Sequence, residues 1–152
     1  MFGLQSIEGI EAVAASLRTL KLGGTRKPIK DLQRLTACSH LETVVLERHT
    51  TAVKALPART IRSLTLCYQV RSDLRSLSRF GQLRKLAFFH GGVQSLAGLL
   101  DLRLDSLELD GLGTPPRLDE ISNATALRQL VLWRLPRVAQ LPDLSKLKRL
   151  VS

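Results

Sequence analysis

The chain has 152 residues, of which 44% are hydrophobic and 24% are charged, and its formal net charge is +10. This balance is ordinary for one folded domain, here residues 1–152. The two cysteines form neither a disulfide framework nor a zinc-binding spacing. The N-terminus has no basic lead and no long apolar run. We therefore expect no signal peptide, no membrane span and a cytoplasmic location.

The first expected element is a short helix over residues 5–15, with Ser6 at its cap, and residues 1–16 are a candidate N-terminal cap for the repeats that follow. From Leu17 onward, one pattern recurs: an apolar residue, two others, an apolar residue, one other, and a third apolar residue. The six copies begin at Leu17, Leu41, Ile61, Leu83, Leu104 and Leu127. They follow each other at intervals of 20 to 24 residues, and a partial seventh copy is expected to begin at Leu147 and end within a strand.

Each copy is predicted to form a strand. Its fourth and sixth residues alternate with polar neighbours, as in a strand with one buried face. Strands that recur in one direction at this interval need crossovers, so the predicted sheet is parallel. Apolar residues at a spacing of three before the strands predict short helices or 3-10 turns, and Cys38 falls on one such row as a small core residue. These rows span residues 7–13, 29–38, 74–80, 96–99, 118–121 and 138–144.

Strings such as LRTLKL, LRKLAF, LDSLEL and LRQLVL resemble the short class of the leucine-rich repeat family, over nearly the whole chain. The resemblance implies an α/β solenoid with a parallel β-sheet on the concave face and short helical or 3-10 returns on the convex face. The chain departs from the family at the ninth position of the repeat, where an asparagine normally bonds the backbone of the turn. That position holds Thr25, His49, Gln69, Gly91, Leu112 and Leu135. We therefore expect irregular turns, with Thr25 and Gln69 as partial substitutes for asparagine.

The repeat aligns equivalent positions into rows across the sheet. The second-position row holds Arg18, Glu42, Arg62, Arg84, Asp105, Arg128 and Lys148. Each acid lies between two bases, so the row predicts a charge ladder, with ligand contact as the alternative. In the third-position row, Lys85 is the basic residue among small and polar ones.

The two rows after the sixth position are the best candidates for binding. The seventh positions are Gly23, Glu47, Cys67, Phe89, Asp110 and Trp133, and the eighth are Gly24, Arg48, Tyr68, His90, Gly111 and Arg134. In the leucine-rich repeat family these strand exits line the edge of the concave face. Exposed aromatic and arginine residues are typical of interface hot spots, and Arg48, Tyr68 and His90 are expected to stack. The alternative for Phe89 and Trp133 is that they tuck under the following loop.

Catalysis has little support in the sequence. The three histidines stand alone, and there is neither a nucleophile elbow nor a phosphate-binding loop, so no enzyme activity, cofactor or metal is expected. The acidic group Asp101, Asp105, Glu108 and Asp110 is interpreted as a solvated stripe.

The sequence instead predicts a module that binds another protein. The predicted binding residues are Arg48, Tyr68, Phe89, His90, Trp133 and Arg134, with Lys85, Arg62, Arg84 and Arg128. The alternative is a basic nucleic-acid-binding solenoid, although the positive charges are spread evenly along the chain. Self-association through an uncapped C-terminal end is also expected. By analogy, such cysteine-poor repeat proteins look like bacterial accessory or immunity proteins.

Overall fold

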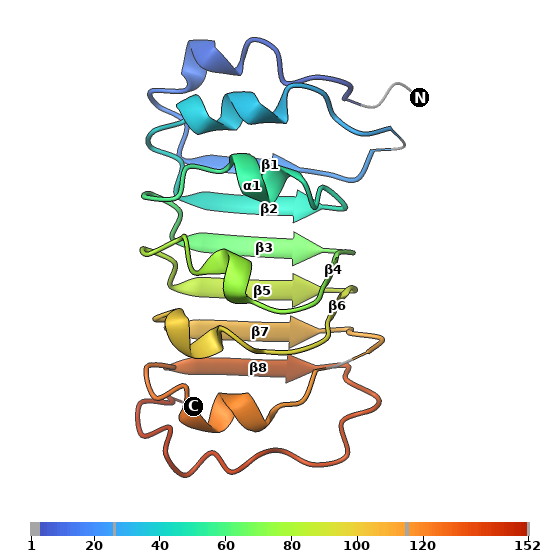
Figure 1. Ribbon diagram of the computed structural model, residues 1–152, viewed down its shortest axis with the longest axis vertical. Helices are drawn as coiled ribbons and strands as arrows, with labels where there is room; N and C mark the ends of the chain where they lie inside the picture. Colours follow the sequence, from blue (N-terminus) through green and yellow to red (C-terminus); the bar gives the residue numbers. More distant parts are fainter. Residues whose placement is uncertain (1–3, 26, 115, 152) are drawn as a thin grey trace.

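The computed structural model describes residues 4–25, 27–114 and 116–151, and one parallel β-sheet dominates it (Figure 1). Its six strands are β1 (Thr19–Leu22), β2 (Thr43–Glu47), β3 (Ser63–Cys67), β5 (Lys85–Phe89), β7 (Ser106–Asp110) and β8 (Gln129–Trp133). They lie side by side in chain order, and every neighbouring pair is parallel. The predicted α/β class with a parallel sheet is therefore confirmed.

The strands pair in the register that the repeat predicts. Fourth-position residues lie opposite each other across the sheet, in the series Leu20, Val44, Leu64, Leu86, Leu107 and Leu130. In the four inner strands these side chains are buried, whereas the fifth-position residues beside them are partly exposed. A slip of one residue would turn the apolar row into water, so burial fixes the register.

A short helical return precedes each strand of the main sheet, and these returns lie over one face of the sheet (Figure 1). They are the 3-10 helices η1 (Ile10–Val13), η2 (Leu32–Ala37), η3 (Arg75–Leu77), η4 (Leu99–Asp101) and η5 (Asp119–Asn123), and the single-turn α-helix α1 (Ala52–Ala55). The spacing of three predicts all of them except α1. Ile61 follows Leu41 by only 20 residues, and the return between them carries buried Ala52 and Val53 instead of a row of leucines.

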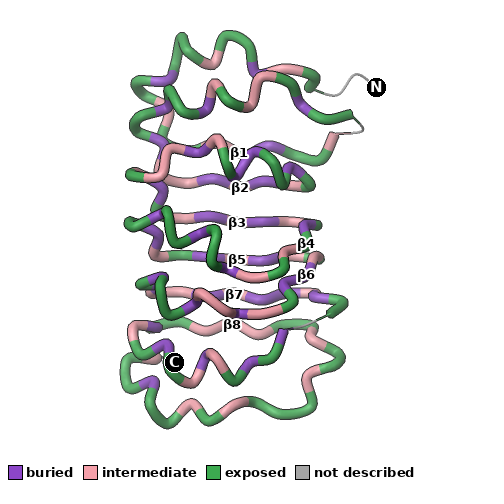
Figure 2. The backbone as a smooth tube through the Cα atoms, viewed as in Figure 1, coloured by how far each residue is buried: buried purple, intermediate pink, exposed green. Residues whose placement is uncertain are grey.

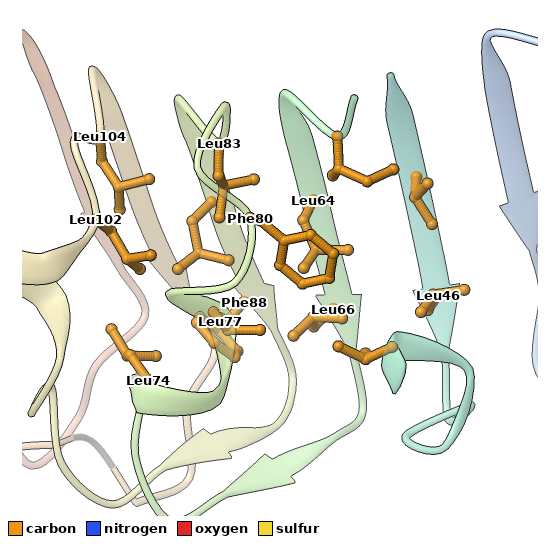
Figure 3. Packing of buried hydrophobic residues seen from close by; sticks show 14 of the residues in the cluster. Leu46, Leu64, Leu66, Leu74, Leu77, Phe80, Leu83, Phe88, Leu102 and Leu104 are labelled. Carbon is orange, nitrogen blue, oxygen red and sulfur yellow. The ribbon is translucent and has the colours of Figure 1, made fainter. Parts of the chain in front are cut away.

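Returns and strands share one apolar core. Figure 3 shows Leu74, Leu77 and Phe80 of one return on the inner side of the sheet, near Leu66 and Phe88 of the strands. All five side chains are buried in the same cluster. Burial of each side chain contributes about 1.5–3 kcal/mol to the stability of the fold. Figure 2 shows the exposed residues concentrated in the loops. Cys38 is buried in this core, as predicted.

Two ninth-position residues tie neighbouring turns together. The amide Nε2 of Gln69 donates to the Leu46 oxygen at 3.1 Å, as expected for an asparagine substitute, and His49 Nε2 lies 2.9 Å from the Gly23 oxygen. Sequence reasoning did not predict this role for His49. Thr25 bonds locally, to the Lys27 oxygen, and Leu112 is buried in the core. The row is therefore part polar and part apolar.

A second, two-stranded sheet lies beyond the strand exits and was not predicted. It consists of β4 (Val70–Arg71) and β6 (Gly92–Val93), which run parallel, and Gly92 also forms an isolated bridge with Thr114. The turns after three successive main strands are thus bonded to each other. This backbone pairing makes the strand-exit side of the sheet continuous.

The N-terminal segment is less helical than the sequence predicts. The helix η1 begins at Ile10, after Gly9 at φ 88°, and not at the Ser6 cap. The Ser6 hydroxyl instead accepts a hydrogen bond from the Glu8 amide at 3.0 Å, and the Ser6 backbone forms an isolated parallel β-bridge with Lys30. The first three residues of the predicted cap lie outside the described residues.

The seventh repeat is shifted by three residues from its predicted start. The Val151 amide donates to the Arg128 oxygen at 2.9 Å, as the Arg128 amide donates to the Asp105 oxygen at 2.8 Å. This contact places Leu150, and not Leu147, at the first position, so the predicted Lys148 does not belong to the second row. No strand forms at residues 150–151.

The helical return predicted over residues 138–144 is also wrong. No helix forms there, and Leu141 is 61% exposed. Pro136 precedes this segment and Pro142 lies within it, and each removes a backbone donor that a helix would use.

The stacked turns leave no room for a side chain at Gly91. A Cβ there would lie 2.1 Å from the Gln69 backbone oxygen, whereas at Gly81 it would meet nothing within 4 Å. We expect Gly91→Ala to lower the free energy of unfolding by about 3 kcal/mol, because backbone atoms cannot yield as side chains do. The control Gly81→Ala should stay within about 1 kcal/mol of the wild type. Urea unfolding of both variants measures the difference, and equal stability would contradict the packing of these turns.

Candidate functional site

Five of the six eighth-position residues form the strand-exit row, which we define as Arg48, Tyr68, His90, Gly111 and Arg134. All five have left-handed backbones, with φ of 64°, 53°, 51°, 64° and 49°. A positive φ costs a residue other than glycine about 1 kcal/mol or more. The row's amides offset this strain with hydrogen bonds of 2.8–3.0 Å to the last residue of the next strand: Arg48 to Cys67, Tyr68 to Phe89, His90 to Asp110, and Gly111 to Trp133.

Three exposed side chains of this row stack on one another. The Arg48 Cζ lies 5.1 Å from the centroid of the Tyr68 ring. The Tyr68 and His90 rings are stacked, with centroids 5.2 Å apart and an interplanar angle of 21°. Each contact is worth about 0.5–1.5 kcal/mol beyond burial. The stack predicted from adjacent repeats therefore forms, and Tyr68 is still 47% exposed within it.

An ion pair continues the row on the far side of Gly111. Arg134 donates from Nε and Nη2 to the two Asp110 oxygens, both at 2.7 Å. The Asp110 side chain is only 10% exposed, compared with 53% for Arg134. A Cβ on Gly111 would lie 2.7 Å from His90 Nδ1, so only glycine leaves space for the His90 ring.

The ion pair shifts the protonation of both partners. Hydrogen bonds from Arg134, assisted by the charges of Arg134 and His90, hold the pKa of Asp110 below its usual value. The same hydrogen bonds raise the pKa of Arg134. Asp110 was interpreted from the sequence as part of a solvated stripe, and that interpretation is wrong. The left-handed turn at Arg134 brings the guanidinium back onto its neighbouring strand.

The seventh-position aromatics flank this ion pair. Phe89 pairs with Asp110, and Asp110 pairs with Trp133, on neighbouring strands. Trp133 is 63% exposed, so it does not tuck under the following loop. Phe89 is half-buried and lies outside the core cluster. Both rings are therefore accessible beside the strand-exit row.

The basic residues of the second and third rows lie at the other end of the strands. Each of the three arginines lies directly before a strand: Arg62 before β3, Arg84 before β5 and Arg128 before β8. Lys85 is the first residue of β5. The strand-exit row lies six positions beyond the second row, a distance of about 20 Å along the strand. The structure thus divides the predicted binding residues into two groups.

The predicted charge ladder forms at one place only among the described residues. Arg18 and Glu42 are 2.8 Å apart. Arg84 instead donates to the backbone oxygens of Leu83 and Gly81, at 2.9 and 3.3 Å, and Asp105 forms no ion pair in the described part of the chain. The ladder prediction is therefore wrong for the central strands, because the Arg84 side chain folds back onto its own loop.

The described residues offer little basis for metal binding, thiol chemistry or a membrane-spanning helix. They hold no group of three or more histidine, cysteine or acidic side chains able to bind a metal. Burial raises the pKa of both Cys38 and Cys67, which keeps the two thiols protonated at neutral pH. Within residues 4–25, 27–114 and 116–151, none of the helices has the length and apolar character that a bilayer crossing requires.

Comparison of the sequence with protein-family models and with curated proteins gives no match.

The Asp110–Arg134 pair predicts a pH-dependent difference in stability. A carboxylate whose folded-state pKa is lowered stabilises the fold above the unfolded-state pKa, and this contribution is lost as the pH falls through the folded-state pKa. Asp110→Asn should therefore be less stable than the wild type at neutral pH, and the two proteins should converge in acid. Denaturant unfolding from neutral pH to about pH 2 measures this gap. The exposed Asp101→Asn is the control, and a gap for Asp110→Asn that does not close in acid would contradict the ion pair.

Proposed function

We propose that the chain is a leucine-rich-repeat solenoid that binds another protein through its strand-exit row and the neighbouring aromatics Phe89 and Trp133. The solenoid proposal is supported by the repeat interval, the in-register parallel strands and the short returns on one face of the sheet. In this proposal the sheet forms the concave face and the returns form the convex face. Solenoids commonly use such extended surfaces for binding.

The observation that carries the proposed function is the ordered, exposed stack of Arg48, Tyr68 and His90. Association usually loses free energy when flexible interface side chains become fixed, at about 0.5–1.5 kcal/mol for each. Here the rings support one another, and left-handed turns anchor their backbones. Exposed tyrosine, tryptophan and arginine are the residues most enriched in binding hot spots.

The distribution of charge favours a protein partner. Arg134 is neutralised by Asp110, whereas Arg62 and Arg84, which form no ion pair within the described residues, lie at the opposite end of the strands. A nucleic acid is best held by a continuous basic stripe, and these positions do not form one with the strand-exit row. The aromatic stack would nevertheless suit single-stranded nucleic acid, whose bases stack on such rings, and this remains the second candidate.

The proposed cellular role is that of a bacterial accessory or immunity protein. A bacterial accessory or immunity protein would use one exposed surface to block one partner, in the cytoplasm and without catalysis, and the solenoid form is compatible with that use. Self-association through the C-terminal end of the repeats is a separate proposal, since strand edges readily pair with other chains.

Four substitutions distinguish the two candidates. Tyr68→Asn keeps a residue type that tolerates the left-handed backbone, and Trp133→Ala removes an exposed ring. For a protein partner, each should weaken binding by more than about 2 kcal/mol, with little change in melting temperature. Arg62→Ala and Arg84→Ala are the matched surface controls and should matter much less.

Titration of each variant with a protein partner and with single-stranded nucleic acid, at two salt concentrations, is the measurement. If the two arginine variants lose more affinity than the aromatic variants and reduce the salt dependence, the protein-binding proposal fails and the nucleic-acid candidate replaces it. A large loss of stability in Trp133→Ala would instead remove that residue from the site.

A further inference from the structure

A basic hollow opens between α1 and η3, outside the proposed binding surface. Its volume is about 480 Å³, and Lys54 of α1, Ser76 of η3 and the intervening Arg71 line it together with Arg79. The hollow adjoins the return between Leu41 and Ile61, which is the shortest between two neighbouring strands of the main sheet.

Arg71 is the central group of this hollow. It is half-buried, and its Nη1 donates to Ser76 Oγ at 3.0 Å. Its Nε is buried and finds no acceptor among the described residues. Burial of a guanidinium is destabilising because its charge loses water, and desolvation lowers the pKa of Arg71, although the charge of Asp73 partly offsets this. Nη2 makes no hydrogen bond within the described residues and, unlike Nε, is not fully buried, so it is the group that an anion in the hollow would reach.

The other charges around the hollow leave it positive. Arg79 is fixed by hydrogen bonds to the Lys54 and Leu56 oxygens, at 2.8 and 3.2 Å, so its charge stays beside the cavity. The lining contains one acid, Asp73, but this carboxylate accepts the Arg75 amide at 2.9 Å and lies 3.5 Å from the Arg75 Nη1. Three cations, Lys54, Arg71 and Arg79, therefore face one carboxylate, whose charge is shared between Arg71 and Arg75.

The hollow also presents hydroxyl donors. Ser76 Oγ accepts from Arg71, so its own proton is free to point toward a ligand. Thr50 and Ser72 add two more hydroxyl groups to the lining. Guanidinium, ammonium and hydroxyl donors in one cavity match the oxygens of a tetrahedral oxyanion.

We infer that this hollow binds phosphate, either as inorganic phosphate or as the phosphomonoester of a small molecule, with Arg71 as its main anchor and Lys54 and Ser76 as further donors. This site is independent of the proposed protein-binding surface. Thr50 and Val70 of its lining each follow a strand-exit residue by two positions, so the two surfaces adjoin.

The direct test follows the Arg71 Nε–H resonance of the wild-type protein by NMR. Inorganic phosphate and glycerol phosphate are titrated separately, at constant ionic strength maintained with chloride. A saturable shift of this resonance with either phosphate supports the site, and tighter binding of glycerol phosphate would identify a phosphomonoester as the preferred source. The absence of a saturable shift with both compounds would overturn the inference.

Two variants test whether the binding is local. Arg71→Gln should weaken phosphate binding at least about tenfold, because charged hydrogen bonds to the ligand are lost. Arg59→Gln is the matched control, since its side chain is exposed and does not line the hollow. Equal losses in both variants would show general charge attraction and overturn the site. The wild-type titration decides the question even if Arg71→Gln folds poorly, and neither result depends on the protein partner.

Discussion

The register of the parallel sheet is the constraint on which the rest of the structure depends. Each strand buries alternate residues against the returns, and each unit is too small to bury its own apolar face. Stacking in register buries the fourth-position row from Val44 to Leu107, and a slip by one residue would expose it. Because backbone hydrogen bonds carry this register from strand to strand, every other position of the repeat is aligned as well. The strand-exit row is a direct consequence of that alignment.

The strand exits show how the same constraint produces a surface. Four of the five members of the strand-exit row donate their amide to the last residue of the next strand, which holds the left-handed turn in place. The side chains therefore leave the sheet in the same direction, so that Arg48, Tyr68 and His90 meet face to face. Gly111 interrupts the row where the His90 ring needs space, and Arg134 turns back onto Asp110. The proposed function rests on this order, since the surface is arranged before any partner arrives.

The leucine spacing was sufficient to predict the strands, their parallel order, their register and the proximity of Arg48, Tyr68 and His90. It could not predict contacts that depend on backbone handedness, such as the Asp110–Arg134 pair, although the glycine at position 111 was a signal of an unusual turn. It missed α1 because alanine and valine replace leucine in the short return. It placed the start of the seventh repeat at Leu147 instead of Leu150. Apolar residues are three apart both in a return and at the start of a strand, so the spacing alone does not distinguish the two positions. The contact of His49 with Gly23 escaped notice, since a lone histidine has no sequence signature for bonding to a neighbouring turn.

The most direct test of this account is the detection of scalar couplings across the backbone hydrogen bonds of the sheet by NMR. The structure requires the Arg84 amide to couple to the Arg62 carbonyl, the Tyr68 amide to the Phe89 carbonyl and the Val151 amide to the Arg128 carbonyl. These three pairs report the register at the strand starts, at the strand-exit row and at the shifted seventh repeat. Observation of all three would establish the alignment on which the proposed surface depends. Couplings of the Arg84 and Tyr68 amides to carbonyls one or two residues away would contradict it, because the aromatic and arginine side chains would then no longer form one row.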